Sequence, residues 1–441
     1  MKKKLIKVFL TSLIVLEIIS FFFIYHSNQA LYKTINMLKD AGYMVVPNDH
    51  VLSSLGQIMP AFYSSLFILS TAGILVSLII CLLAMLFYKT KFKNSKNLLT
   101  YFSVFLAVLM VQGLILVSLA DKSIFLRTRD YLLLSNTPGI AINNFYYKYT
   151  SYAAQALNPP FDKQVKSCWI DPEIEEQENL ARLLSRFGWF NTSNRTDTTF
   201  IIEKSSDNNL VFQHKKKTIS SVSLKRFLQD PSSYLKEYSE KTDHAFFIRF
   251  LCAVGLFTGL PIFCFTNLFW FISLLCSKLM PEKNAMFLSG ILVSGLTMIS
   301  LLYLNPTNRP DDIKEIQKML KSPKSKTRIE AVRILYHNNE DIWQFPGYCK
   351  THVTSSFIAE KYWLANAFSK SNTIKSVQYL KKLLKDDSIN VKCASIKALS
   401  KLMCNDESAN IFKGLIITSP EWYVQQYAYN AFKGCQWKQI Q

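Results

Sequence analysis

Hydrophobic and polar positions follow two different patterns in this 441-residue chain. Long apolar stretches occupy much of the first three quarters, at residues 5–25, 61–88, 98–119, 246–276 and 285–304. A helix of about 20 apolar residues crosses a hydrocarbon core of about 30 Å. The pattern therefore predicts five membrane spans, three in residues 1–119 and two in 246–304, on either side of a polar segment at 120–245.

The fourth apolar stretch is the longest and contains Gly259, Pro261 and Asn267. These residues predict a tilted or kinked helix, because glycine and proline interrupt regular helical packing and hydrogen bonding. A re-entrant or double helix here is the alternative. It would change the side of the membrane on which the carboxy-terminal region lies.

Lysines near the spans predict the orientation. They precede the first stretch, fill the loop after the second and flank the fifth: Lys2, Lys3, Lys4, Lys7, Lys89, Lys91, Lys93, Lys96, Lys278 and Lys283. Basic residues on short loops stay in the cytoplasm. Residues 120–245 and the carboxy-terminal region then lie outside it, and the Lys-, Asn- and Ile-rich composition favours a bacterial inner membrane. A signal peptide is the alternative for the first stretch, but Glu17 interrupts it and no Ala-x-Ala-like site follows.

A second pattern begins at Met319, where the run MLKSPKSKTRIEAVRIL starts a repeat. Similar runs start at His352, Leu383 and Ile416, so the four starts are 33, 31 and 33 residues apart. Each run reads as the end of one short helix, a polar turn and a second helix with an apolar face. A period of this length is typical of stacked helix pairs that bury their apolar faces against one another.

The motif LLKDDSINVKCASIKAL, from Leu383, resembles HEAT-like repeats of the phycobilisome-lyase type. The resemblance covers about residues 311–435. It implies an α-solenoid in 311–441 that binds a protein partner, and it does not imply lyase chemistry. The second unit departs from the pattern, since Trp343, Pro346 and Gly347 predict an irregular first half.

Basic side chains recur at equivalent positions of the second helices. One column holds Arg328, Lys361, Lys392 and Gln425, and five residues on another holds Arg333, Asn366, Lys397 and Asn430. One interpretation is a ridge that binds a partner through Arg328, Arg333, Lys361, Lys392 and Lys397. The other is that these side chains pair with turn acids such as Asp386 and Asp387 and with neighbouring helix ends.

The chain carries 51 basic and 31 acidic residues. The lysines beside the spans account for much of this excess, and residues 305–441 hold 21 basic against 12 acidic residues. We therefore do not predict nucleic-acid binding. An acidic protein or the anionic lipid surface is a more plausible partner for the basic repeats.

Residues 120–245 read as a small α+β domain. Asp171 and Pro172, followed by three glutamates, predict a helix start, and the strands 198–203 and 210–214 around a polar turn predict a hairpin. A helix is expected over 224–238. Earlier, aromatic residues recur at helical spacing over 140–157, which predicts either a helix at the bilayer interface or the packing face of the domain.

Three polar residues within the predicted spans need partners: Glu17, Gln112 and Asn267. Glu17 is the leading candidate, because an ionisable group at mid-depth is costly unless it is neutral, paired or hydrated. It serves either as a proton or ligand site, or as a hydrogen-bonded link between helices, for example to Gln112.

The sequence contains no P-loop, GxGxxG, HExxH, GxSxG or paired CxxC motif, and we predict no catalytic residue, metal or cofactor. Cys404 and Cys435 fall near equivalent repeat positions and are candidates for a disulfide. The fold class expected is mainly α, a polytopic membrane protein with an α+β domain and a solenoid. Two functions fit: a membrane scaffold that binds a protein partner, or a membrane enzyme or transport component for a lipid-like substrate.

Overall fold

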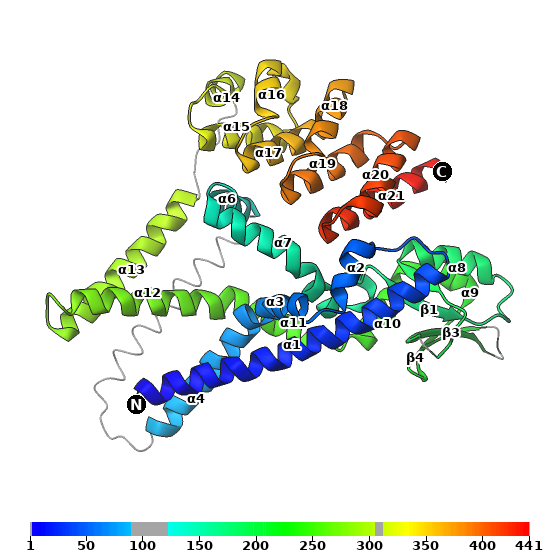
Figure 1. The fold of residues 1–441 in the computed structure, drawn as a ribbon, viewed down its shortest axis with the longest axis horizontal. Coiled ribbons are helices and arrows are strands. Elements are labelled where there is room, and N and C mark those ends of the chain that lie inside the picture. Colours follow the sequence, from blue (N-terminus) through cyan, green and yellow to red (C-terminus); the bar gives the residue numbers. More distant parts are fainter. Residues whose placement is uncertain are drawn as a thin grey trace. The chain divides into compact units, whose positions relative to one another are not determined.

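The computed structural model describes residues 2–89, 122–304 and 312–440, apart from Asp197, Ser206 and Asn208. Within these residues the fold is mainly helical, with one small sheet (Figure 1). The predicted span 98–119 and its Gln112 lie outside the described residues, as do Lys91, Lys93 and Lys96.

Three helical segments are long and apolar enough to cross a membrane: Ile6–Asp40, Ile58–Cys81 and Phe246–Cys276. They match three of the five predicted spans. The fifth predicted stretch is also helical, in α13 (Glu282–Leu304), whose Asn284–Leu296 part is apolar. The first helix, α1 (Lys2–Asp40), continues well past the predicted end at residue 25.

The described chain forms two compact units. The first consists of Met1–Phe21, Ser65–Asn143 and Phe250–Ile334. It holds the apolar helices η1 (Leu69–Gly73), α4 (Ile74–Lys89), η3 (Gly255–Gly259), α12 (Leu260–Cys276) and α13, together with α6 (Lys122–Leu132) and α14 (Ile313–Leu320). The boundary between the two units falls within α3 (Ile58–Ile68) and α11 (Phe246–Val254).

Inside the first unit, two π-helical turns pack against each other. Gly255 and Gly259 of η3 have the GxxxG spacing of close helix contacts. A Cβ added at Gly255 would lie 2.4 Å from the carbonyl oxygen of Thr71 in η1. The backbones of the two helices therefore touch, and only glycine fits at this crossing.

The second unit consists of Phe22–Ser64, Asn144–Arg249 and Leu335–Gln441. Its sheet has the order β2-β1-β3-β4-β5. The strands are β1 (Lys166–Ile170), β2 (Trp189–Asn191), β3 (Phe200–Lys204), β4 (Asn209–His214) and β5 (Lys217–Ser223). β1 is parallel to β2 and β3, whereas β3, β4 and β5 are antiparallel neighbours. The predicted hairpin is thus confirmed as β3 and β4.

Two helix predictions in this region need correction. The helix after Asp171 begins only at Gln177, as α8 (Gln177–Arg186), because the Asp171 carboxylate accepts from the backbone N–H of Glu173 and, at 3.4 Å, of Lys204 in β3. The predicted helix 224–238 is two helices, α9 (Leu224–Gln229) and α10 (Pro231–Thr242). Proline lacks a backbone N–H, so the break falls at Pro231.

Each predicted repeat contains two helices, as its sequence predicts. The second helices are α15 (Ser325–His337), α17 (Ile358–Phe368), α19 (Ile389–Leu402) and α21 (Trp422–Ile440). Their partners are α14, α16 (Pro346–His352), α18 (Ile374–Leu383) and α20 (Asp406–Thr418). The second repeat is irregular where predicted, with a 3-10 turn, η4 (Ile342–Gln344), before the short α16. One equivalent position is fully buried in all four second helices: Ala331, Leu364, Ser395 and Ala428.

Residues from far apart in the sequence share one core in the second unit. It joins Leu31, Ile35 and Leu38 of α1, Leu52 and Leu55 of α2 (Asp49–Leu55), Tyr152 of α7 (Thr137–Leu157), and Trp422 of α21. The last repeat is therefore not a separate domain. It folds onto segments that precede and follow the second and third predicted spans.

Candidate functional site

The basic side chains of the first column contact turns of their own repeat or of the next one. Lys361 forms an ion pair with Asp386 in the turn of the next repeat. Lys392 lies 3.3 Å from Glu421 in the turn after that. Arg328 donates to the carbonyl oxygens of Ser322 and Pro323, at 2.9 and 3.0 Å. These contacts match the second interpretation of this column, pairing with turn acids and helix ends.

Arg333 belongs to a buried ionic network in the first unit. Its guanidinium lies 2.7 Å from Asp130 of α6 and 2.9 Å from Glu330. Glu330 also pairs with Arg127 of α6, at 2.5 Å. Burial lowers the pKa of Arg333, against the opposing effect of Glu330 and Asp130. Both Arg333 and Asp130 are less than 5 % exposed, so this arginine links helices and does not face a partner.

Lys397 is the one member of the five predicted binding residues that is exposed. It lies close to Lys401 of α19 and, through that side chain, to Lys370 at the end of α17. The pKa of Lys401 is lowered by partial burial and by the charges of Lys397 and Lys370. Lys370 contacts uncharged groups, the Asn339 side-chain oxygen and the Tyr336 ring. We name Lys370, Lys397 and Lys401 the lysine patch.

A loop from the amino-terminal third closes the last repeat. The Asn48 side chain donates to three carbonyl oxygens at the end of α20, those of Ile416, Ile417 and Ser419, at 3.1, 2.8 and 3.0 Å. The last carbonyls of a helix have no partner within the helix. The Asn48 backbone N–H in turn donates to Gln425, at 2.8 Å. Gln425 occupies the column where earlier repeats place Lys361 and Lys392, so this loop takes the place of a following repeat.

The aromatic face of α7 is a packing face. Tyr147 accepts from the Asn390 amide of α19 at 3.0 Å, and Tyr152 packs edge-on against Trp422 with 5.0 Å between ring centres. Thr150 is hydrogen-bonded to the Tyr423 hydroxyl, whose pKa is raised to about 12, mainly by burial. Of the two expectations for this helix, packing accounts for these contacts.

Glu17 and Asn267, two of the polar residues in the predicted spans, make different contacts. Glu17 accepts a hydrogen bond of 2.5 Å from Ser65 of α3, and its second oxygen is buried with no partner in the described part of the chain. Asn267 donates to the Phe263 carbonyl of its own helix and is exposed. Glu17 therefore joins two helices of the first unit, whereas Asn267 is satisfied locally.

Sequence reasoning missed Asn48 and the Gly255–Gly259 crossing. The GxxxG spacing was readable in the apolar stretch. Locally Asn48 caps α2 by accepting from the Val51 N–H. Its partners in and after α20 lie 368 to 377 residues away along the chain, and no nearby pattern indicates them. The structure does contain the disulfide that the repeat positions suggested, between Cys404 and Cys435.

Among the described residues, no group of three His, Cys, Asp or Glu side chains is placed to hold a metal ion. Comparison of the chain with protein-family models, with curated proteins and with solved structures finds no match.

Proposed function

We propose that this protein is a membrane-anchored scaffold whose repeats bind an acidic protein partner outside the cytoplasm. The proposal rests on which segments of the chain make up the second unit. Two segments, Phe22–Ser64 and Asn144–Arg249, fold with the last three repeats into one body, although apolar helices separate these segments along the chain. The apolar helices hold this body at the membrane. Side chains of the repeats that make no internal ion pair remain exposed and can bind a partner.

The assembly of the second unit from segments separated by apolar helices also supports a five-span topology. The second unit needs residues 22–64, 144–249 and 335–441 on one side of the membrane. The chain must then cross an even number of times between 65 and 143, and again between 250 and 334. Three spans alone do not satisfy this condition, because the helix Ile58–Cys81 would have no returning partner. The predicted spans 98–119 and 285–304 supply the two returns.

Two observations favour the extracytoplasmic side for this body. The lysines around the spans place the amino terminus in the cytoplasm, and one crossing later the chain enters the second unit. Disulfides persist outside the cytoplasm, and Cys404 and Cys435 form one in the repeats. Large apolar side chains that stay exposed on the spans, such as Ile14, Ile18 and Phe271, suit a lipid surround.

The lysine patch is the surface we assign to the partner. The pairing of Lys361 and Lys392 and the burial of Arg333 leave Lys397 as the available member of the predicted ridge. Three ammonium groups that repel one another favour an acidic partner, since a carboxylate placed among them would relieve that repulsion.

The test is co-purification of the full chain from mild detergent, with proteins identified and quantified by mass spectrometry. We expect a stoichiometric acidic protein that is lost when Lys397 and Lys401 are changed to Glu. Lys350 and Lys413, which are also exposed on the repeats, changed to Glu in a second variant, provide the matched control. Retention of the protein by the first variant, or no such protein with the wild type, would contradict the proposal. Glu17→Gln should keep the partner; its loss would favour the enzyme or transport alternative.

A further inference from the structure

The outer edge of β5 has no neighbouring strand. β5 (Lys217–Ser223) is the last strand of the sheet order, paired only with β4 among the described residues. An edge strand offers a row of backbone N–H and C=O groups to another extended chain. Most of its side chains are small and polar, and Ser221 is exposed. The geometry of this edge suits the addition of a sixth strand.

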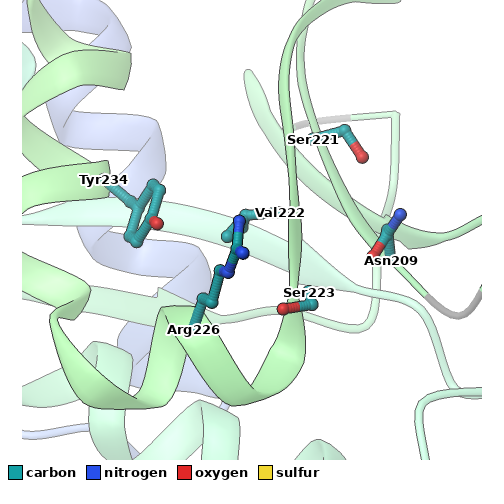
Figure 2. A pocket seen from close by; sticks show the side chains of 6 residues that line it. All are labelled: Asn209, Ser221, Val222, Ser223, Arg226 and Tyr234. Atoms are coloured by element: carbon teal, nitrogen blue, oxygen red, sulfur yellow. The ribbon is translucent and has the colours of Figure 1, made fainter.

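A hollow lies at the end of this strand (Figure 2). Its volume is about 450 Å³, and it is lined by Asn209, Ser221, Val222, Ser223, Arg226 and Tyr234. Arg226 rises from the first turns of α9 beside β5, next to Tyr234 of α10. Together with the serines and Asn209, these side chains surround the hollow with hydrogen-bond donors.

Arg226 is available for an anion. It is exposed, and among the described residues no acidic side chain lies within ion-pair distance of it. Residues 209–229, which contain β4, β5 and α9, hold Lys215, Lys216, Lys217, Lys225 and Arg226 and no acidic residue, and single acids, Asp207 and Asp230, border this range. Positive charge therefore flanks the free edge at both ends, which selects for a partner of negative charge.

From the free edge and this charge we propose that β5 binds an extended acidic peptide segment of another protein. The segment adds to β5 as an antiparallel or parallel strand through backbone hydrogen bonds, and one of its carboxylates enters the hollow to pair with Arg226. Strand addition of this kind draws affinity from the main chain and specificity from a side-chain pocket. This surface is separate from the lysine patch, and the inference does not rest on the proposed function.

The test begins with a library of random heptapeptides displayed on phage, selected on the full chain in detergent micelles. We expect the enriched peptides to carry Asp or Glu and β-branched residues. For the best peptide, measured by fluorescence anisotropy, Arg226→Gln should weaken binding by about 10-fold or more, because a charge-assisted hydrogen bond contributes about 1.5–3 kcal/mol. Arg182→Gln, at an exposed arginine of α8, is the matched control and should leave binding unchanged.

The strand geometry is tested on the peptide, so that the wild-type protein can be used. Backbone N-methylation at each position in turn should weaken binding at every second residue, because alternate N–H groups of an edge-bound strand face β5. Selection of peptides without acidic residues, equal binding to Arg226→Gln, or tolerance of N-methylation at all positions would overturn the proposal. The Lys397→Glu, Lys401→Glu variant should bind the peptide normally, which separates this site from the lysine patch.

Discussion

At the residue scale, Lys166 is the least expected side chain of the second unit. It begins β1 and is only 6 % exposed. Its ammonium donates to the Phe161 carbonyl oxygen at 2.7 Å and lies 5.2 Å from the centre of the Trp189 ring. Burial, together with the charge of Lys433, lowers the pKa of Lys166 to about 7. The charged form is thus disfavoured when the chain is folded.

This lysine predicts a pH dependence of stability. Between about pH 7 and its ordinary pKa of 10.5, the unfolded chain binds more protons at this site than the folded chain, so the folded state gains stability as pH rises. We expect Lys166→Met to raise the melting temperature at pH 7 and to raise it less at pH 9. The free-energy difference between the two proteins should change by at most about 1.4 kcal/mol per pH unit. Tryptophan fluorescence during heating in detergent measures it, and an equal difference at both pH values would contradict the assignment.

We expect substitution of Asn48 to lower the stability of the folded chain. Asn48→Ala removes the donor to the carbonyl oxygens of Ile416 and Ile417, while the Ser419 carbonyl keeps its hydrogen bond from Gln425. It also removes the side-chain acceptor that caps α2 at the Val51 N–H. Unsatisfied buried groups cost about 1–3 kcal/mol each at most, and we expect a total destabilisation of about 2–4 kcal/mol. The melting temperature should fall, and limited proteolysis should first cut in α20 or α21. Ser53→Ala, at an exposed residue of α2, is the control; an equal fall in both variants would show that the contacts to α20 contribute little.

At the element scale, the crossing of η1 and η3 makes a sharp prediction. Gly255→Ala places a Cβ 2.4 Å from the Thr71 carbonyl oxygen, well inside van der Waals contact, so the two helices must separate. Overpacking of this kind costs about 1–3 kcal/mol. Gly295→Ala in α13 is the matched control, because nothing lies within 4 Å of a Cβ there. We expect a lower melting temperature in detergent for Gly255→Ala alone, and similar values for both variants would count against the close crossing.

Elements defined by local signals were predictable from the sequence. The β3–β4 hairpin follows from alternating strands around a polar turn, and the irregular start of the second repeat follows from Pro346 and Gly347. Elements decided by distant partners were not. The Asp171 carboxylate does not cap α8; it accepts a hydrogen bond from the backbone N–H of Lys204 in β3. β1 and β2 pair in parallel across an intervening helix, which no periodicity within either strand reveals.

The same distinction applies to the candidate site. Equivalent basic positions identified the column of Lys361 and Lys392, but the turn acids that neutralise it lie in the next repeat. The free charge is instead in the lysine patch, where Lys370 comes from a different helix pair. Repeat spacing predicts which side chains are aligned, whereas the stacking of helices decides which of them remain unpaired.

At the scale of the whole molecule, the last three repeats are part of a composite body. Trp422 and Gln425 contribute to a core and a hydrogen-bond cluster with residues of α1, α2 and α7. Deleting residues 311–441 would therefore expose Leu31, Ile35 and Tyr152 as well as remove the repeats. Loss of a partner after such a deletion would not distinguish a missing surface from a misfolded protein, whereas charge reversal in the lysine patch does.

Because this body is assembled from interleaved segments, it makes membrane topology a test of the fold. Single cysteines at the exposed residues Ser53, Ser221 and Lys375 sample its three segments, and Ser277 samples the turn between α12 and α13. With five crossings, a membrane-impermeant maleimide added to intact cells should label the first three, and Ser277→Cys only after the membrane is opened. The native Cys168, Cys349 and Cys393 are buried. Cys81, Cys252, Cys264 and Cys276 are not, so they are changed to Ser in the parent chain, above all Cys276 beside Ser277. Labelling of Lys375→Cys on the side opposite to Ser53→Cys would contradict both the five-span topology and the shared core, since no protein body can pack across the bilayer that separates its parts.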